Sequence, residues 1–400
     1  MSDELSSYQT PFKGMKVVDL SGGIAGPYCG VMLGQYGADV IKVEAPRGDW
    51  SRLLGRSYSG HTAYSVVGSL GKRNAAIDLK TAEGKEILWR LLRGADVFLE
   101  GFPPGAIKRL GFDYEAVRAR EPKIIYLSMS GYGQTGPLAA RRAMDPILQA
   151  YIGITNENRG QFDNHPHRFE LSAIDMFAGM SAFQAVSTSL FVREREGKGR
   201  YLDYSLLHAA AMMSATRMIA SYFDGFIGRS TNVGGVYDTA DGQFNLTTVR
   251  HEEWEDICHS IEHPELLTDP RFDELEKRKA GRDELIEALR PMFREHTTAA
   301  LVNRLSARGI MCSEVNTYSD FLKEEHVTQS GIMSWLNMPG FPRQVPVANF
   351  PGLPPLESGT RRGYAPLCGE HTTQVLGELG YSEQEIAGLL DRQVVASALK

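Results

Sequence analysis

Short apolar runs alternate with amphipathic stretches through the first part of the chain, residues 1–135. Two runs, Lys16–Leu20 and Ala38–Glu44, have the length and composition of buried strands. The segment between them is glycine-rich at residues 21–30 and then helix-compatible to about Tyr36. A strand, a turn, a helix and a second strand within about thirty residues are typical of a parallel sheet covered by helices.

The same order recurs further along. Strand-like runs follow at Asn74–Leu79, Ala95–Glu100 and Lys123–Ser130, and apolar residues recur at helical spacing in Ala82–Arg93. The pattern predicts an α/β protein whose first part is a large, open, Rossmann-like parallel sheet.

The middle of the chain is more helical. Asp175 precedes a long apolar run with the composition of a helix, and a second helix from about Ser205 to Phe223 follows one short strand. Turn-forming residues then dominate Gly228–Gln243, and Glu252–Arg308 is charged and mostly helical. These shifts predict a smaller, inserted α/β domain at residues 225–330.

A proline-rich segment after Trp335 is predicted to be extended and to lead back to a last helix near Glu383. The large domain is therefore expected to combine residues 1–224 and 331–400.

Composition argues against several classes of protein. Hydrophobic residues make up 42% of the chain and charged residues 23%, which is ordinary for a globular protein. The net charge is −6 and no run of Lys or Arg marks a tail, so nucleic acid is not expected as a partner. The four cysteines form no Cys-x-x-Cys pair, so neither a metal site nor a disulfide framework is predicted.

The expected location is the cytoplasm. The longest apolar region, Ala209–Phe223, contains Arg217 and is shorter than a bilayer span, so no membrane association is expected. The first ten residues are polar and acidic, unlike a signal peptide. The few, scattered cysteines favour a reducing compartment.

The glycines at positions 22, 23, 26 and 30 suggest a dinucleotide-binding turn, but their spacing does not fit. The G-x-G-x-x-G pattern would need glycine at positions 24 and 27, where the chain has Ile24 and Pro27. A tight turn between strand and helix is the favoured interpretation.

Basic residues gather near two predicted turns. Lys72, Arg73 and Lys80 surround one short strand, and Lys108 and Arg109 follow a Pro-Pro-Gly turn. Such groups can bind the phosphates of an anionic ligand through charge-assisted hydrogen bonds. Considered on charge alone, ordinary solvated surface is the favoured interpretation.

Asp175 lies where an aspartate commonly caps the start of a helix. Taken alone, capping is the favoured role. A catalytic role is compatible with it, because the helix dipole and the free N–H groups are expected to hold the carboxylate deprotonated and aimed.

Ordered motifs along nearly the whole chain resemble the class III CoA-transferase family (CaiB/BaiF type). They include GxKVxD from Gly14, GADVIKVE from Gly37, KRxxxxDLKTAEGK from Lys72, GFxPGAIxRLGF from Gly101, SGYGQTGP from Ser130, DPILQA from Asp145, DPRF from Asp269 and APxxGEHTxxVLxELGYS from Ala365.

The resemblance implies a large α/β domain, a small inserted domain and a homodimer of two interlocked rings. It also implies Asp175 as the catalytic nucleophile, a CoA thioester as substrate, no tightly bound cofactor and no metal. The implied contacts with the nucleotide part of CoA and its phosphates are Ile77, Asp78, Leu79, Lys80, Gly101, Phe102, Pro103 and Arg109, with Lys72 and Arg73 as further basic candidates. The implied contacts nearer the thioester are Ile24, Ala25, Arg142, Ala143, Met144 and Asp145.

The chain departs from the family pattern at three places. The formyl-CoA enzymes have glutamine at the position of Ile24 and tyrosine at that of Met144, and a longer run of glycines where this chain has Gly234 and Gly235. Oxalate exchange is therefore not favoured. The racemases have a histidine at the Met144 position, and methionine cannot transfer a proton, which disfavours a racemase.

The expected function is the transfer of CoA from an acyl-CoA donor to a free carboxylic acid through covalent aspartyl intermediates. Small dicarboxylic acids are the favoured substrates, with succinyl-CoA as a candidate donor, because several arginines can pair with a second carboxylate. These arginines are Arg141, Arg142, Arg168 and Arg217.

Candidate oxyanion donors are the backbone N–H groups of Gly234–Gly235 and of the Ser130–Gly136 loop. An acyl-CoA racemase or isomerase and a non-catalytic CoA- or nucleotide-binding protein remain alternatives.

Overall fold

The computed structural model describes residues 10–160, 164–225, 233–248 and 250–398. Contacts between residues divide the chain into two compact units, and each is described by itself. The larger unit comprises Met1–Asn158, Pro166–Ala215 and Thr328–Lys400, so both ends of the chain contribute to it. The smaller unit comprises Arg159–His165 and Thr216–Val327. The domain borders expected at residues 225 and 330 remain predictions.

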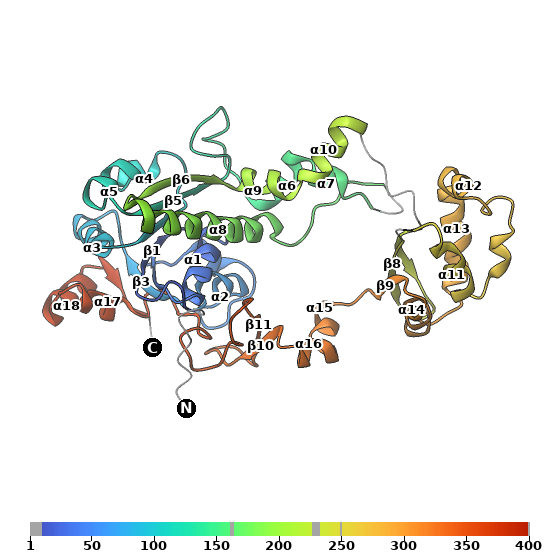
Figure 1. Cartoon of the computed structure of the whole chain (residues 1–400). Coiled ribbons are helices and arrows are strands. Elements are labelled where there is room, and N and C mark those ends of the chain that lie inside the picture. Colours follow the sequence, from blue (N-terminus) through green and yellow to red (C-terminus); the bar gives the residue numbers. More distant parts are fainter. Residues whose placement is uncertain (1–9, 161–163, 226–232, 249, 399–400) are drawn as a thin grey trace. The chain divides into compact units, whose positions relative to one another are not determined.

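Within the described residues, the larger unit contains a seven-stranded sheet in the order β12-β3-β2-β1-β4-β5-β6 (Figure 1). All neighbouring strands are parallel except β12, which is antiparallel to β3. The prediction of a large, mostly parallel sheet is confirmed. The strands are β1 (Lys16–Leu20), β2 (Asp39–Glu44), β3 (Arg73–Ile77), β4 (Val97–Glu100), β5 (Ile125–Ser130), β6 (Arg200–Ser205) and β12 (Val395–Ala396).

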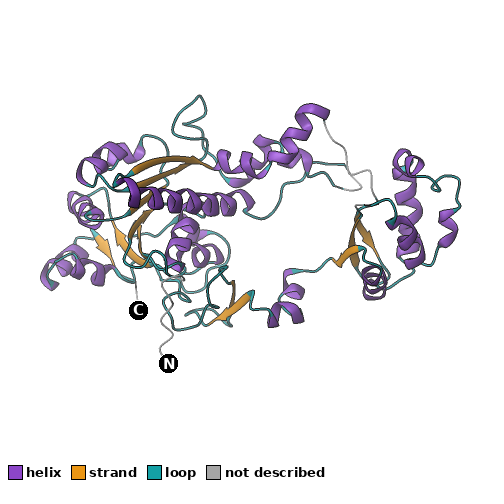
Figure 2. Ribbon diagram, in the orientation of Figure 1, coloured by secondary structure: helices purple, strands orange, loops and turns teal. Residues whose placement is uncertain are grey.

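The central strands are apolar because helices cover both faces of the sheet (Figure 2). Every residue of β4 and β5 is buried. Successive side chains of β1 point to opposite faces, so that Val17 joins one hydrophobic core and Val18 joins the other. Helices α1 (Ala25–Gln35) and α8 (Ala173–Glu196) supply the core around Val17. The core around Val18 is supplied by α3 (Ala82–Leu92), α5 (Tyr114–Arg120), α17 (Thr372–Glu378) and α18 (Glu383–Asp391).

The predicted helix at Ala82–Arg93 is confirmed as α3, where the Thr81 hydroxyl caps the Gly84 N–H. The glycine-rich turn is shorter than expected, because α1 begins at Ala25 and includes Gly26 and Gly30. The proline-rich segment after Trp335 is only partly extended, since it contains a strand that pairs with residues just before it.

The remaining elements of the larger unit surround the edges of the sheet. They are η1 (Trp50–Leu53), α2 (Ala63–Ser69), α4 (Ala106–Leu110), α6 (Asp145–Ile152), α7 (Ile154–Glu157), α9 (Leu206–Met213), α16 (Glu325–Gln329), which extends past Val327 into this unit, and the hairpin β10 (Met333–Leu336) with β11 (Val345–Ala348).

The smaller unit packs helices on an antiparallel sheet, in the order β7-β8-β9. Its core is aromatic at the centre, where the rings of Tyr237, Phe244 and Phe293 are in mutual contact. The elements assigned here are β7 (Gly235–Asp238), β8 (Gln243–Thr247), β9 (Met311–Glu314), α10 (Ala215–Asp224), α11 (Glu253–Ser260), η2 (Pro264–Leu267), α12 (Leu275–Ala280), α13 (Arg282–Phe293), α14 (Thr298–Ala307) and α15 (Tyr318–Phe321).

Candidate active site

The candidate site lies where the direction of strand addition reverses. From β1 the chain adds β2 and β3 on one side of the sheet, then returns to place β4 on the other side of β1. The turns after β1 and β4 meet there, since a Cβ built on Gly101 would lie 3.4 Å from the Ser21 Cβ. Ligands of open α/β sheets bind in this crevice, outside the carboxyl ends of the strands.

Two adjoining cavities occupy this crevice. The smaller, of about 200 Å³, is lined by Asp175, Ile24 and Leu206, among others. The larger, of about 490 Å³, is lined by Phe102 and Arg142, among others. Six residues line both cavities, so these residues form the neck between them. They are Trp50, Gly101, Ser130, Gly131, Ala143 and Met144.

Asp175 lies in the first turn of α8, but it does not cap that helix. Ser172 occupies the N-cap position and makes no side-chain cap. Instead, one oxygen of the Asp145 carboxylate accepts from the backbone N–H groups of Ile174, at 2.7 Å, and Asp175, at 3.0 Å. The capping interpretation of Asp175 is therefore wrong, because a carboxylate distant in sequence satisfies these donors.

Asp145 was expected to contact CoA near the thioester, and the structure places it elsewhere. It is buried and lines neither cavity. Its second carboxylate oxygen accepts from the Gln149 side chain at 2.6 Å, so both oxygens are engaged inside the protein. The prediction that Asp145 contacts the ligand directly is therefore corrected: Asp145 supports the site from inside the protein.

The electrostatic state of Asp175 also differs from the expectation. Burial, followed by the nearby Asp145 charge, raises the pKa of Asp175 to about 7. These two effects outweigh the helix dipole, which was expected to hold the carboxylate deprotonated. A more basic carboxylate is a better nucleophile once it is ionised, so the same environment suits Asp175 to attack a carbonyl.

A buried ion pair supports the turn that forms the floor of the smaller cavity. The Lys72 ammonium donates to the Asp19 carboxylate at 2.7 Å and to the Pro27 carbonyl at 2.6 Å. The other Asp19 oxygen accepts from the Ser21 N–H at 3.0 Å, which fixes the start of the turn. Gly30 makes this possible, because a Cβ there would lie 2.9 Å from the Lys72 ammonium.

Lys72 and Arg73 do not lie where phosphate ligands would require them. The Lys72 side chain is fully buried in its ion pair, so its charge is not available to a ligand. Arg73 begins β3, at the amino end of a parallel strand and hence at the edge opposite the crevice. Its guanidinium pairs there with Asp39 and Glu378. Both assignments as phosphate contacts are corrected for this reason.

The other predicted contacts fall into two groups. Lining the cavities are Ile24, Ala25, Gly101, Phe102, Pro103, Arg142, Ala143 and Met144. The second group lies at the end of β3 and in α4, outside both cavities, and consists of Ile77, Asp78, Leu79, Lys80 and Arg109. Ile77 is buried, whereas Lys80 and Arg109 are exposed. Contact of this second group with CoA remains a prediction.

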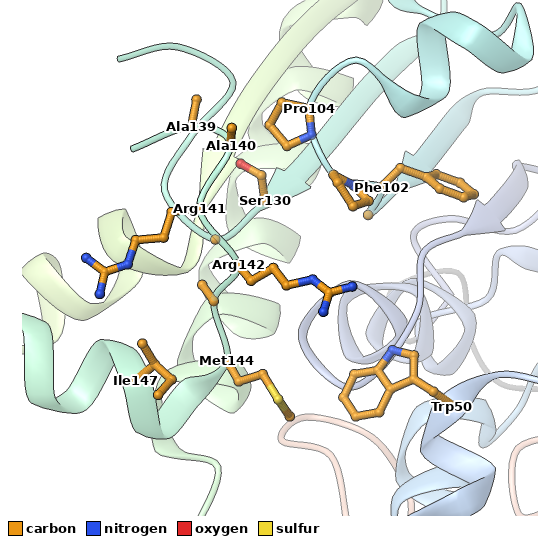
Figure 3. Close-up of a pocket in the computed structure, with 14 residues that line it drawn as sticks. Trp50, Phe102, Pro104, Ser130, Ala139, Ala140, Arg141, Arg142, Met144 and Ile147 are labelled. Carbon is orange, nitrogen blue, oxygen red and sulfur yellow. The ribbon is translucent and has the colours of Figure 1, made fainter. Parts of the chain in front are cut away.

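The four arginines expected to bind a second carboxylate are placed differently. Arg142 lines the larger cavity and has no ionic partner among the residues described by the structure. Arg141 lines the same cavity, but its guanidinium lies over the rings of Tyr132 and Tyr151 and points away from Arg142 (Figure 3). Arg168 pairs with Glu170, and Arg217 belongs to the smaller unit, as do Gly234 and Gly235.

Trp50 was missed in the sequence, although it lines both cavities. Its position shortly after β2 could have identified it as a site residue, because that strand also ends at the crevice. Leu206 was missed as well, since it reads as an ordinary apolar residue of α9.

The described part of the chain contains no group of three or more His, Cys, Asp or Glu side chains that could hold a metal ion. None of its helices has both the length and the apolar character required to cross a bilayer.

Together, the crevice and its buried carboxylate define a candidate ligand site at the carboxyl ends of a parallel sheet. The chain belongs to CoA-transferase family III, whose sequence profile matches residues 12–372, and it is an enzyme of that class.

Similar proteins cover almost the same length. Succinyl-CoA:glutarate CoA-transferase of Mus musculus is 31% identical, over 96% of this chain and 90% of its own. Formyl-CoA:oxalate CoA-transferase of Escherichia coli is 28% identical, over 96% of this chain and all of its own. The crystal structure of a CaiB/BaiF family protein from Brucella suis is 29% identical, with a TM-score of 0.82 over 93% of this chain and all of that one.

Replacing the Asp175 carboxylate is expected to stabilise the protein. The pKa of Asp175 is raised from an ordinary value near 3.8 to about 7 on folding, so its stabilising contribution is complete below pH 4 and is lost as pH rises through 7. Asp175→Asn cannot ionise, so the variant should gain at most about 4 kcal/mol at pH 8 and little at pH 4. Urea unfolding at both pH values measures this. A variant less stable than the wild type at pH 8 would contradict it.

Removing the Asp145 charge is expected to make Asp175 more acidic. Asp145→Asn keeps an oxygen for the two N–H groups of α8 but removes the negative charge that raises the Asp175 pKa. The acidic limb of the pH–rate profile should therefore move to lower pH. Asp145→Ala is the matched comparison, because it also leaves two buried donors unpaired, at about 1–3 kcal/mol each. If the acidic limb of the pH–rate profile were unchanged in Asp145→Asn, the charge of Asp145 would not be what raises the pKa of Asp175.

Proposed function

We propose that this enzyme moves CoA from an acyl-CoA donor to a free carboxylic acid, through covalent intermediates on Asp175. The observation that carries the proposal is the Asp175 carboxylate, which lines a cavity at the switch point of the sheet and has a pKa near 7. Membership of CoA-transferase family III supports the same chemistry.

The reaction begins with attack of the Asp175 carboxylate on the thioester carbonyl of the donor. The carbon–sulfur bond breaks, which gives a mixed anhydride and CoA thiolate. Thiolate is a good leaving group because an ordinary thiol has a pKa of about 8.5. The thiolate then attacks the aspartyl carbonyl of the anhydride, releases the donor acid as its carboxylate and forms an aspartyl-CoA thioester.

The second half repeats these steps with the acceptor. Its carboxylate attacks the aspartyl thioester, expels CoA thiolate and forms a new mixed anhydride. The thiolate attacks the acyl carbonyl of this anhydride, which forms the product thioester and regenerates the Asp175 carboxylate. One thioester replaces another, so no nucleoside triphosphate is consumed. Backbone N–H groups of the Ser130–Gly136 loop are the proposed oxyanion donors, since Ser130 and Gly131 line both cavities.

Small dicarboxylic acids are the proposed substrates, with succinyl-CoA as a donor. The relative from Mus musculus is named for succinyl-CoA and glutarate. Within this chain, Arg142 supplies a positive charge at the wall of the larger cavity, and Figure 3 shows its side chain directed toward Trp50. A guanidinium binds a carboxylate through two parallel hydrogen bonds, so Arg142 is the proposed partner of the distal carboxylate.

Two further parts of the proposal concern assembly and location. We assign the protein to a homodimer of interlocked rings, in line with the family resemblance. Large apolar side chains of α10, including Ile219, Tyr222 and Phe223, are exposed in the single chain and suit burial in a subunit interface.

The cytoplasm is the proposed location, where the free thiols of the four cysteines would be maintained.

Mixing the purified protein with succinyl-CoA and a panel of free acids should produce new CoA thioesters, detected by mass spectrometry. Hydroxylamine added during turnover should convert Asp175 to the hydroxamate, located by peptide mapping, and Asp175→Ala should abolish both signals. Deuterium exchange at the α-carbon without acyl transfer would favour a racemase instead. Binding of CoA with neither reaction would indicate a binding protein, and an active Asp175→Ala enzyme would remove Asp175 from the mechanism.

Substitution of Arg142 should affect dicarboxylic acids selectively. Arg142→Gln removes the proposed partner of the distal carboxylate, so kcat/KM should fall at least about tenfold for glutarate and much less for butyrate. Arg141→Gln is the matched control, because Arg141 is adjacent in sequence and lines the same cavity, but its guanidinium lies over Tyr132 and Tyr151. Equal losses with the two acids would show that Arg142 does not recognise the second carboxylate.

A further inference from the structure

Trp50 occupies a position in the site that the proposed chemistry does not yet use. It opens η1, a short helix that follows β2, and its side chain lines both cavities of the crevice. The indole is 45% exposed, although it lies directly over the floor of the smaller cavity. A large apolar ring exposed within a cavity is available to pack against whatever enters it.

The backbone around Trp50 is held firmly on both sides. The Asp49 carboxylate accepts from the Ser51 N–H at 2.8 Å and from the Gly23 N–H at 3.2 Å, which ties η1 to the glycine turn. The Asp49 N–H in turn donates to Glu44 at 2.7 Å. On the other side, the Thr62 hydroxyl donates to the Ser51 carbonyl at 2.8 Å.

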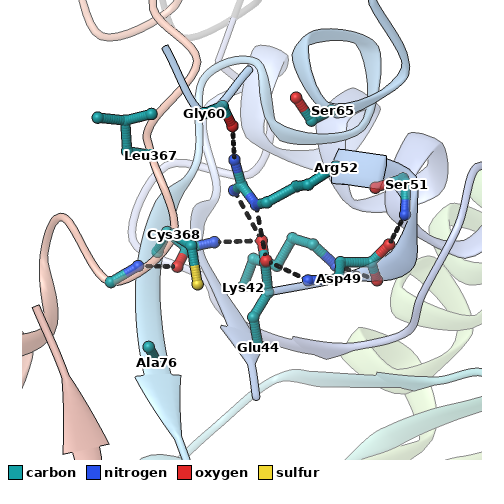
Figure 4. Close-up of polar contacts among 12 residues, drawn as sticks. Lys42, Glu44, Asp49, Ser51, Arg52, Gly60, Ser65, Ala76, Leu367 and Cys368 are labelled. Carbon is teal, nitrogen blue, oxygen red and sulfur yellow. Dashed lines mark hydrogen bonds and ion pairs between the residues drawn. The ribbon is translucent and has the colours of Figure 1, made fainter. Parts of the chain in front are cut away.

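A buried charge network reinforces this anchor (Figure 4). Arg52 forms two hydrogen bonds of 2.8 Å with the Glu44 carboxylate, and Asn74 donates to the same carboxylate at 2.6 Å. The Lys42 ammonium lies 3.7 Å from Asp49 and donates to the Ser21 carbonyl at 2.7 Å. Because these groups are almost fully buried, η1 and the turn after β1 form one rigid wall.

The indole itself is fixed by the glycines beneath it. Gly23 adopts a φ of +78°, and a Cβ at that position would lie 2.3 Å from the Trp50 Cζ2 atom. The ring therefore rests on the turn at a distance that only glycine permits. Trp50 cannot move toward the turn, so a ligand in the neck has to fit the space that the ring leaves.

Met144 faces Trp50 across the neck, as Figure 3 shows, and is 53% exposed. A flexible thioether opposite a fixed ring gives a slot with one rigid and one adaptable side. Asp175 lines the smaller cavity beyond this slot, whereas Arg142 lies on the side of the larger cavity. With the distal carboxylate at Arg142, as proposed above, an acyl group whose carbonyl reaches Asp175 places the carbons next to that carbonyl between Trp50 and Met144.

We infer that Trp50 is a specificity-determining residue that admits acyl groups unbranched at the α-carbon and excludes α-branched ones. A flat ring beside the carbonyl accepts a methylene chain lying along its face, but an α-methyl group would be directed into the ring. The inference rests on the proposed transfer of CoA, and it specifies the acids as linear. Acids with a substituent beside the carboxylate are the class that the slot rejects.

The test compares two acceptors, glutarate and 2,4-dimethylglutarate, in which both α-carbons carry a methyl group, with succinyl-CoA as donor. Wild-type enzyme should prefer the linear acid. In Trp50→Ala, the ratio of kcat/KM for the linear acid to that for the branched acid should fall at least about tenfold, mainly because kcat/KM for the branched acid rises. In Trp50→Phe, most of the wild-type preference for the linear acid should remain. Leu53→Ala is the control, because Leu53 lies on the same short helix, is 81% exposed and lines neither cavity.

Two additional measurements separate a specificity role from a structural one. The melting temperatures of Trp50→Phe and Leu53→Ala should match that of the wild type within a few degrees. Trp50 fluorescence, obtained as the difference between wild type and Trp50→Phe, should change when acyl-CoA binds. A ratio unchanged in Trp50→Ala, in an enzyme that still transfers CoA, would overturn the role of Trp50 and leave the proposed function intact. Absence of transfer in the wild type would instead overturn the proposed function.

Discussion

The carboxylate of Asp145 joins the beginning of α6 to the beginning of α8, and the active site depends on this junction. One of its oxygens accepts hydrogen bonds from two backbone N–H groups in the first turn of α8, and one of these belongs to Asp175 itself. These bonds fix the backbone of Asp175. A carboxylate buried at a helix N-terminus is compensated by those donors and by the dipole of the helix. Burial raises the pKa of Asp175 most, and the negative charge of Asp145 raises it further, so Asp145 influences both the position and the basicity of Asp175.

The opposite wall of the site has its own buried electrostatic support. Asp19, Lys42 and Lys72 lie beneath the turn after β1, and Glu44 and Arg52 lie beside η1. Buried ion pairs contribute little net stability unless every partner is satisfied, but they restrict the arrangements that the surrounding backbone can adopt. Here they hold the glycine turn and Trp50 as one surface. The site thus has two supported walls, one that carries Asp175 and one that carries the glycine turn and Trp50.

The sequence was sufficient for the sheet, and insufficient for the contacts that support the candidate site. Strands such as β4 and β5 are continuously apolar because they are buried on both faces, so local composition reveals them. Lys72 was a candidate ligand contact because of its charge, and Asp145 because of the family resemblance. Their actual partners, Asp19 and the first turn of α8, are 53 and about 30 residues away, and no local pattern encodes such contacts. Trp50 was missed for a similar reason, since its role follows from a close approach to Gly23 in space.

The antiparallel strand β12 has a consequence for how the protein is made. Its two residues, Val395 and Ala396, form the last strand of the chain, yet they pair with β3 near the beginning. During synthesis, the edge of β3 therefore stays without its neighbour until Val395 and Ala396 have been translated. A chain that stops short of this strand would present an unpaired row of backbone donors and acceptors, the feature through which nascent sheets associate with one another. Premature termination would thus expose an aggregation-prone edge, even though every residue of the catalytic crevice had already been synthesised.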